Sequence, residues 1–377
     1  PKTRWLLTGV LALAFLICAW NWVRYFDAAL ASMPHGQWDA WAMWNPKARF
    51  LASDDWLAGF SPEIYWSHPD YPLLFPAAIA HGWAVLGEES AAVPRAMGAL
   101  FTFGTVLLLS VSVAALRGVA HGLLAGIVMM GCAAFAGHGV TQYADVPLSF
   151  FYLATLVFIA HHDLAPERQR GWLVLAGLAA GMAASTKNEG LAFCVSAAVS
   201  LGLVTALFRG AREGIRSLIA FLLGAAPFLL VTLSIKLFLA PKNWLLRQQT
   251  ELTLTQRLLS GERIRTIAHS FWSEFKAFGG FAGHIAGYLL ALYALVLGVR
   301  LKAGHTAPLI AMLTLVATIG SVCFVLLATP FNLQWQLGTS SSRLFCQWLP
   351  SLIFVYFLWL DTPEERAAEP SPVSSAA

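Results

Sequence analysis

About ten apolar stretches near the length of a membrane-spanning helix constrain this chain more than any other feature. A helix needs about 20 mainly apolar residues to cross the hydrocarbon core of a bilayer. Lipid offers no hydrogen-bond partner to an open backbone, so such stretches cross it as helices. The predicted fold is an all-α polytopic membrane protein with about ten transmembrane helices. They are expected at 5–23, 96–116, 120–137, 146–161, 172–186, 189–208, 217–239, 284–299, 306–328 and 344–360.

The composition agrees with a chain that lies mostly in lipid. Of the 377 residues, 58% are hydrophobic and 12% are charged, whereas a soluble domain carries about 25% charged residues. The net charge of +4 is spread through loops, so no nucleic-acid partner is expected. The five cysteines stand in apolar stretches without the spacing of metal ligands, and we expect them to act as small hydrophobic residues.

One further apolar stretch, residues 73–86, is too short to cross the membrane by itself. Its length of about 14 residues is typical of a re-entrant or interfacial helix. We therefore expect the first outer loop, residues 24–95, to contain interfacial helices rather than an additional span.

The loop charges predict which side of the membrane each loop faces. With 73–86 not spanning, alternate loops read LRGVAHG, HHDLAPERQRG, RGAREGIR and VRLKAGH, and each contains Lys or Arg. Short basic loops face the cytoplasm, so both termini are predicted to be cytoplasmic. The segments predicted to face outside are 24–95, 138–145, the turn around 187, 240–283 and 329–343.

The chain is predicted to form one integral membrane domain, residues 1–361. Its second long outer loop, residues 240–283, has an amphipathic spacing of leucines, which predicts surface helices on the outer leaflet. Residues 362–377 are rich in Pro, Ser, Ala and Glu. This composition predicts a disordered cytoplasmic tail.

Three ionisable residues lie at the outer ends of the predicted spans. Asp39 is in the first outer loop, Asp145 precedes the span 146–161, and Lys187 is in a tight turn between two spans. A turn this short holds its residues at membrane depth, where ionisable groups are costly and usually functional.

The order of these residues resembles the GT-C polytopic glycosyltransferases, such as aminoarabinose transferase and the protein O-mannosyltransferases. Asp39 opens the first outer loop and stands at that family's spacing before a DW pair, here Asp55–Trp56. SHPDYPLLFP resembles the half-helix of the family, YADVPLSFF carries the acidic residue that opens a later span, and TKNEG carries a lysine between the fifth and sixth spans. The resemblance covers roughly residues 1–210, and beyond them only the pattern of spans is similar.

The resemblance implies a glycosyltransferase of the bacterial inner membrane that uses a polyprenyl-phosphate sugar. It would move the sugar, with inversion, to an acceptor on the outer face. Its partners would be this donor and membrane lipid, while the sugar and the acceptor stay open. The alternative is a transporter or flippase of a lipid-linked or small solute, and a third is a structural subunit of an envelope complex. Inverted repeats and charges near the midplane are typical of a transporter, but here the unusual charges gather at the outer ends.

Asp39 is the main candidate for the base that accepts the proton of the acceptor hydroxyl. The alternative is a helix cap or a solvated loop aspartate. Asp145 is the second catalytic candidate, either orienting the acceptor or holding a divalent metal, and it could equally cap the span that follows.

The departing lipid phosphate needs cations at the outer membrane surface. Lys187 is the leading candidate for binding this phosphate. The alternative is that its side chain only extends to the membrane interface to keep its charge in water. Arg343 follows the hydroxyl-rich run GTSSS. It is predicted either to bind the same phosphate or to anchor the last span at the membrane interface.

His68, Asp70 and Tyr71 are predicted to contribute to a substrate or metal site. One His and one Asp are fewer ligands than a catalytic metal usually takes from a protein, so a metal cofactor stays open.

Aromatic and basic residues of the first outer loop predict how it contacts the bilayer. Lys47 and Arg49 are expected to touch lipid headgroups. Tryptophans are typical of an interfacial belt, which we favour over stacking on a sugar. They are Trp38, Trp41, Trp44, Trp56 and Trp66.

Overall fold

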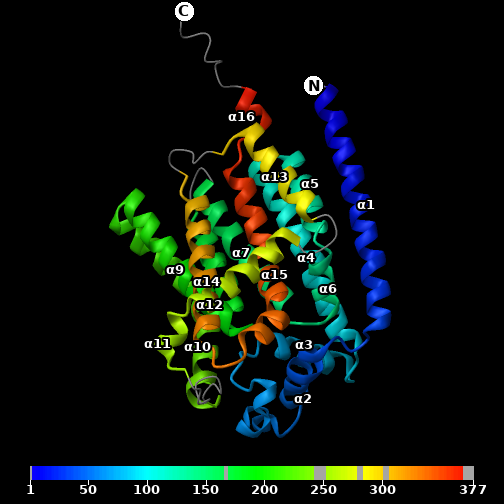
Figure 1. Cartoon of the computed structure of the whole chain (residues 1–377), viewed down its shortest axis with the longest axis vertical. Coiled ribbons are helices and arrows are strands. Elements are labelled where there is room, and N and C mark those ends of the chain that lie inside the picture. The colour runs from blue at the N-terminus through cyan, green and yellow to red at the C-terminus, as the bar shows by residue number, and fades with distance from the viewer. Residues whose placement is uncertain (1, 165–168, 242–251, 278–282, 300–304, 368–377) are drawn as a thin grey trace, which may run out of the picture.

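The computed structural model describes residues 2–164, 169–241, 252–277, 283–299 and 305–367, and this part of the chain is built from helices (Figure 1). The prediction of an all-α polytopic membrane protein is confirmed. Within the described ranges, six helices are long and apolar enough to cross a bilayer. They are α1 (Lys2–Ser32), α4 (Ala92–Arg117), α7 (Asp145–Leu164), α9 (Asn188–Arg209), α10 (Ala211–Phe238) and α14 (Ala307–Ala328).

The other expected spans correspond to bent or shorter helices, so the number ten is approximate. The expected span 120–137 is a pair, α5 (Val119–Met130) and α6 (Ala133–Val140), bent by 65°. Two further helices, α8 (Gly171–Ala184) and α13 (Gly283–Leu297), are apolar but shorter than a full span.

The last expected span is the second half of a longer helix, α15 (Leu333–Trp359, 27 residues). Its first half contains the polar run that was predicted to precede the membrane. The helix begins at Asn332, whose side chain accepts a hydrogen bond from the Trp335 backbone N–H at 3.0 Å. The hydroxyl of Ser340 donates back to the Gln336 carbonyl at 2.6 Å, which lets a polar side chain continue the helix. In this way α15 carries Arg343 into the bundle.

The core of the bundle surrounds α7. Within its most apolar stretch, 83% of the residues are buried, and α4, α8 and α15 pack against it. Tyr152 of α7 stacks on Phe193 of α9, with ring centroids 3.9 Å apart. By contrast, only 6% of the corresponding stretch of α1 is buried, and this helix lies at the edge of the bundle (Figure 1), as expected of a helix that faces lipid.

Close contact between α8 and α10 depends on glycine. A Cβ atom at Gly177 would lie 1.8 Å from the Phe221 carbonyl oxygen, and one at Gly224 would lie 1.9 Å from that of Val174. No side chain fits at such distances, so the two backbones approach through these positions. This packing supports the turn between α8 and α9, which carries Lys187.

The first outer loop folds into short helices that have a core of their own. They are η1 (Ala40–Trp44), α2 (Asn45–Ala52), η2 (Trp56–Phe60), η3 (Pro62–Ser67) and α3 (Leu74–Leu86). Trp44, Phe75, Ile79 and Trp83 are buried together in this core. With 13 residues, α3 is shorter than a span, as its sequence indicated. It lies with α2 at the end of the bundle opposite the termini (Figure 1).

The described part of the second outer loop contains two helices, α11 (Leu254–Leu258) and α12 (Gly261–Ala277). Residues 242–251 and 278–282, which include Leu246 of the predicted leucine pattern, lie outside the described residues. In α12, Ile267 is buried while Ile264, Trp272 and Phe275 are exposed. Exposed apolar side chains of this kind suit the outer leaflet that the sequence predicted for these helices.

The first residues of the tail that was predicted to be disordered, 362–377, are ordered. Pro363–Ala367 form a short helix, α16. Thr362 and Glu365 cap it reciprocally, with bonds of 2.8 Å and 3.2 Å. Glu365 also pairs with Arg117 of α4 at 3.1 Å. The prediction is therefore wrong for these first residues, because a capping box and an ion pair hold them, while 368–377 lie outside the described residues.

Single cysteines in a variant without native cysteines test the predicted sidedness. Asp55→Cys and Thr255→Cys are exposed positions at the end of the bundle with α2 and α11, and Arg212→Cys is exposed in a predicted cytoplasmic loop. We expect a membrane-impermeant thiol reagent to label the first two from one side and the third only from the other. Labelling of all three from one side contradicts the topology.

Candidate functional site

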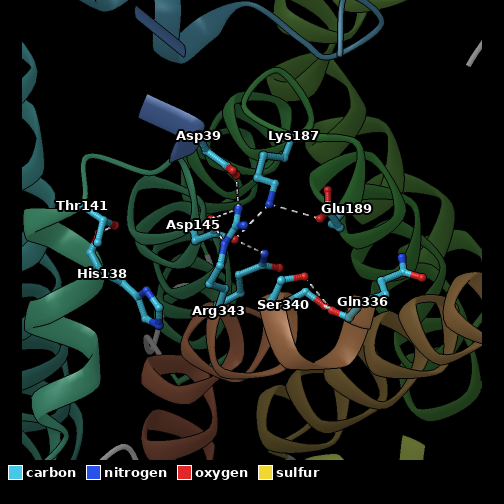
Figure 2. A network of polar contacts seen from close by, with 11 residues as sticks. Asp39, His138, Thr141, Asp145, Lys187, Glu189, Gln336, Ser340 and Arg343 are labelled. Atoms are coloured by element: carbon cyan, nitrogen blue, oxygen red, sulfur yellow. Dashed lines mark hydrogen bonds and ion pairs between the residues drawn. The ribbon is translucent and has the colours of Figure 1, made fainter. Parts of the chain in front are cut away.

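Four of the predicted site residues meet in one network of charges (Figure 2). Asp39 comes from the first outer loop, Asp145 from the start of α7, Lys187 from the turn before α9, and Arg343 from α15. These segments are far apart in the sequence, so the network joins the first outer loop to three helices of the bundle.

Asp145 is the centre of the network and is 1% exposed. Its Oδ1 accepts from Lys187 Nζ at 2.9 Å and from Gln347 Nε2 at 2.6 Å. Its Oδ2 accepts from Arg343 at 3.0 Å and 3.2 Å. As the first residue of α7, its carboxylate is also stabilised by the positive end of the helix dipole. Both oxygens are thus occupied by donors of the chain itself.

Arg343 connects the two aspartates. Its Nη2 donates to Asp39 Oδ2 at 2.5 Å as well as to Asp145, and its guanidinium lies over the ring of Tyr143 at 4.5 Å. The planar fork of arginine reaches two carboxylates and an aromatic face at once, which a lysine ammonium does less well. Asp39 therefore sits directly beside a cation that α15 holds in place.

Lys187 is 4% exposed and contacts two carboxylates, since its Nζ also lies 3.2 Å from Glu189 Oε1. Burial by itself lowers the pKa of the Lys187 ammonium, but Asp145 and Glu189 raise it more, so the net shift is upward. The ammonium is therefore charged at neutral pH despite its burial.

The other three predicted residues lie in a second cluster, in the turn between η3 and α3. His68 has a left-handed backbone, with φ of 48°, and its carbonyl accepts a hydrogen bond from the Lys47 ammonium. The His68 and Tyr71 rings stack with centroids 4.9 Å apart. Asp70 accepts from Asn188 at 3.2 Å, and its backbone carbonyl accepts from Lys236 at 3.0 Å.

The second cluster is electrostatically connected to the network. Burial is the main cause that lowers the pKa of His68, and the charges of Asp39 and Lys187 also reach this imidazole. Burial likewise raises the pKa of Tyr71, with a contribution from Glu189. The two groups are also joined by a direct contact, because Asn188, which stands between Lys187 and Glu189 in the chain, donates to Asp70 at 3.2 Å.

Some residues of this site were missed or misplaced by sequence reasoning. Gln347 and Lys236 carry no motif, and their roles appear only from their contacts with Asp145 and Asp70. Lys47 was expected at lipid headgroups, yet it is 2% exposed, because the fold of α2 turns it toward the His68 carbonyl. Arg49, by contrast, is exposed and pairs with Glu89 at 2.8 Å.

The five tryptophans that were predicted to form an interfacial belt differ in their exposure. Trp44 is fully buried, so its assignment to an interfacial belt is wrong: it packs against Tyr71 and Phe75. The remaining four are at least 41% exposed and remain available to lipid, namely Trp38, Trp41, Trp56 and Trp66. Within the described ranges, no three His, Cys, Asp or Glu side chains gather as metal ligands.

Comparison with known proteins gives this fold and site a context. Residues 68–236 match the family model described as dolichyl-phosphate-mannose-protein mannosyltransferase. The fold is similar to the crystal structure of ArnT from Cupriavidus metallidurans in the apo state, with a TM-score of 0.51 and 15% identity. The resemblance to the GT-C superfamily is confirmed. The similarity covers 95% of this chain and 61% of the ArnT chain, and no curated protein matches the sequence.

The matched segment contains only some of the residues that carry the GT-C resemblance. Asp70, Asp145 and Lys187 lie within 68–236, whereas Asp39 and Arg343 lie outside it. Similarity at 15% identity shows the shared fold, so the contacts of Asp39 and Arg343 are known from this structure alone.

Asp145→Asn tests how far the fold depends on the network. Removing one partner of a buried ion pair costs about 3–5 kcal/mol, because the remaining charge is left buried without compensation. We expect a clearly lower midpoint of thermal unfolding in detergent. The control is Glu89→Gln, which breaks the exposed pair with Arg49 and should cost about 1 kcal/mol or less. Equal midpoints for the two variants contradict the structural role of Asp145.

Lys47 predicts a pH dependence of stability. Burial lowers its pKa from 10.5 to about 7, a shift that Asp70 opposes and Lys236 reinforces. Between these two values the unfolded chain binds a proton that the folded chain does not, so the free energy of unfolding rises with pH. Lys47→Met should remove this rise. Thermal unfolding from pH 7 to 10 measures it, and parallel profiles for the two proteins contradict the prediction.

Proposed function

We propose that this protein is a glycosyltransferase that moves a sugar from a polyprenyl-phosphate donor to an acceptor on the outer face of the membrane. The observation that carries the proposal is the contact of Asp39 with Arg343, beside Asp145 and Lys187. The Asp39 carboxylate thereby lies 2.5 Å from the guanidinium of Arg343, which shares Asp145 with the buried ammonium of Lys187. The description of the matching family, which includes a polyprenyl-type phosphate sugar, supports the same reaction class.

The proposed reaction has one displacement step. The acceptor hydroxyl attacks the anomeric carbon of the donor sugar, and Asp39 accepts the hydroxyl proton. The bond between this carbon and the phosphate oxygen breaks, and the electron pair leaves with the polyprenyl phosphate. A direct displacement inverts the configuration of the sugar carbon, in agreement with the inversion that the GT-C resemblance implies.

Arg343 and Lys187 are proposed to stabilise the departing phosphate. Negative charge grows on the phosphate oxygen as the bond breaks, and fixed cations in a site shielded from water are the effective way to stabilise it. Asp145 is proposed to act as a positioning residue, because it holds these two cations through hydrogen bonds of 2.9–3.2 Å. Gln347 is proposed to orient the Asp145 carboxylate, to which it donates at 2.6 Å. Holding the cations in place beforehand avoids the cost of orienting them during the reaction.

The second cluster is proposed to line the same site. Lys47 and Lys236 flank the turn that contains His68, Asp70 and Tyr71, and both can donate hydrogen bonds at this side. The exposed tryptophans of the first outer loop would hold this loop on the outer surface of a bacterial inner membrane, with both termini in the cytoplasm.

Asp39→Asn is the decisive variant, because asparagine keeps the shape and removes the base. We expect turnover with a polyprenyl-phosphate sugar to fall by about 10² or more. The asparagine oxygen can still accept from Arg343, so the thermal midpoint and the lipid that co-purifies should change little. Asp54→Asn, at an exposed position of the same loop, is the matched control and should keep full activity.

Two results would overturn the proposal. Near-normal transfer by Asp39→Asn would remove this residue as the base. Movement of an unchanged lipid-linked or small solute across vesicles by the wild type, without any glycosidic product, would instead favour the transporter alternative. Mass spectrometry of the acceptor and of the released polyprenyl phosphate distinguishes these results from the expected one.

A further inference from the structure

One face of α15 carries a stripe of polar side chains into the site. Gln336, Ser340, Arg343 and Gln347 follow at intervals of four, three and four residues, which places them on the same side of a helix. Figure 2 shows Gln336, Ser340 and Arg343 on the side of α15 that faces Lys187 and Glu189. The stripe therefore crosses the whole site along the helix axis.

The two halves of the stripe have different partners. Arg343 and Gln347 both donate to Asp145. At the other half, Gln336 Oε1 is buried and has no hydrogen-bond partner among the described residues, and the same is true of Glu189 Oε2 on the facing side. The second amide oxygen of the stripe, Gln347 Oε1, is likewise buried without a partner in the described part of the chain. A buried polar atom without a partner costs about 1–3 kcal/mol, so two of them at the same side of a site point to a group that the ligand brings.

The chemistry of this half defines the missing group. Glu189 Oε2 and Gln336 Oε1 are acceptors. The Ser340 hydroxyl already donates its proton to the Gln336 carbonyl at 2.6 Å, so its oxygen can only accept a further bond. Three acceptors require a ligand with several donors close together. A phosphate diester offers no donor, whereas the hydroxyl groups of a sugar ring do.

We propose that Glu189, Gln336 and Ser340 bind the hydroxyl groups of the donor's sugar ring and thereby select which sugar is transferred. The inference rests on the proposed function, in which Arg343 and Lys187 take the phosphate. The cationic half and the acceptor half of the site then orient the donor, with the anomeric carbon between them.

Two lipid probes test the assignment: decaprenyl phosphate, and the same lipid carrying mannose. Binding to the full chain in detergent is measured by native mass spectrometry. We expect the wild type to bind the mannose-bearing lipid more tightly. Gln336→Leu should lose this preference, and Ser340→Ala, which keeps a good helix former, should reduce it about three- to ten-fold. Both should bind decaprenyl phosphate as the wild type does.

Thr339→Ala is the matched control, since Thr339 neighbours Ser340 but is exposed and off the stripe. It should keep the preference. Decaprenyl phosphate that binds without any preference for the mannose-bearing form, or a preference that survives Gln336→Leu and Ser340→Ala, overturns the inference and leaves the proposed phosphate site intact. Failure of both probes to bind the wild type overturns the proposed function itself.

Discussion

The buried carboxylate of Asp145 is the group on which the site depends. A charge at 1% exposure is tolerated in a membrane protein only if donors surround it, because its desolvation costs several kcal/mol. Lys187, Arg343 and Gln347 supply those donors from two other helical segments. Any change in the packing of α7 against α15, or of the turn before α9, would leave a charge unpaired. The need to satisfy this carboxylate thereby fixes the geometry of the two cations.

The first outer loop depends on the same network. Asp39 reaches Arg343 from the start of η1, and the loop closes around its own core of Trp44, Phe75 and Ile79. From the bundle, Lys236 of α10 binds the Asp70 carbonyl and Asn188 of α9 binds the Asp70 side chain. The loop is therefore attached to the bundle at polar points on two sides and carries exposed tryptophans on its surface. This arrangement agrees with the proposal that a lipid-linked donor and an acceptor meet at this site.

Most of the charged residues of the site could be predicted from the sequence by one physical rule. Ionisable residues at membrane depth are costly, so Asp39, Asp145, Lys187 and Arg343 stood out against apolar surroundings, and the structure brings all four together. Gln347 did not stand out, because a glutamine within an apolar helix has no distinctive pattern. Lys47 stood out but was misplaced, because amphipathic spacing in a short helix does not say which face the rest of the loop covers.

The sequence by itself determined the fold class, since long apolar stretches in lipid have to close their hydrogen bonds within helices. It also determined that 73–86 is too short to cross as one helix, because length alone limits it. Only the tertiary structure decided how the helices divide, with 120–137 bent by 65° and α15 extended through a polar run. It also decided which donor meets which carboxylate. Contacts such as that of Arg343 with Asp39 join residues about 300 positions apart, and no local pattern in the chain encodes such a distance.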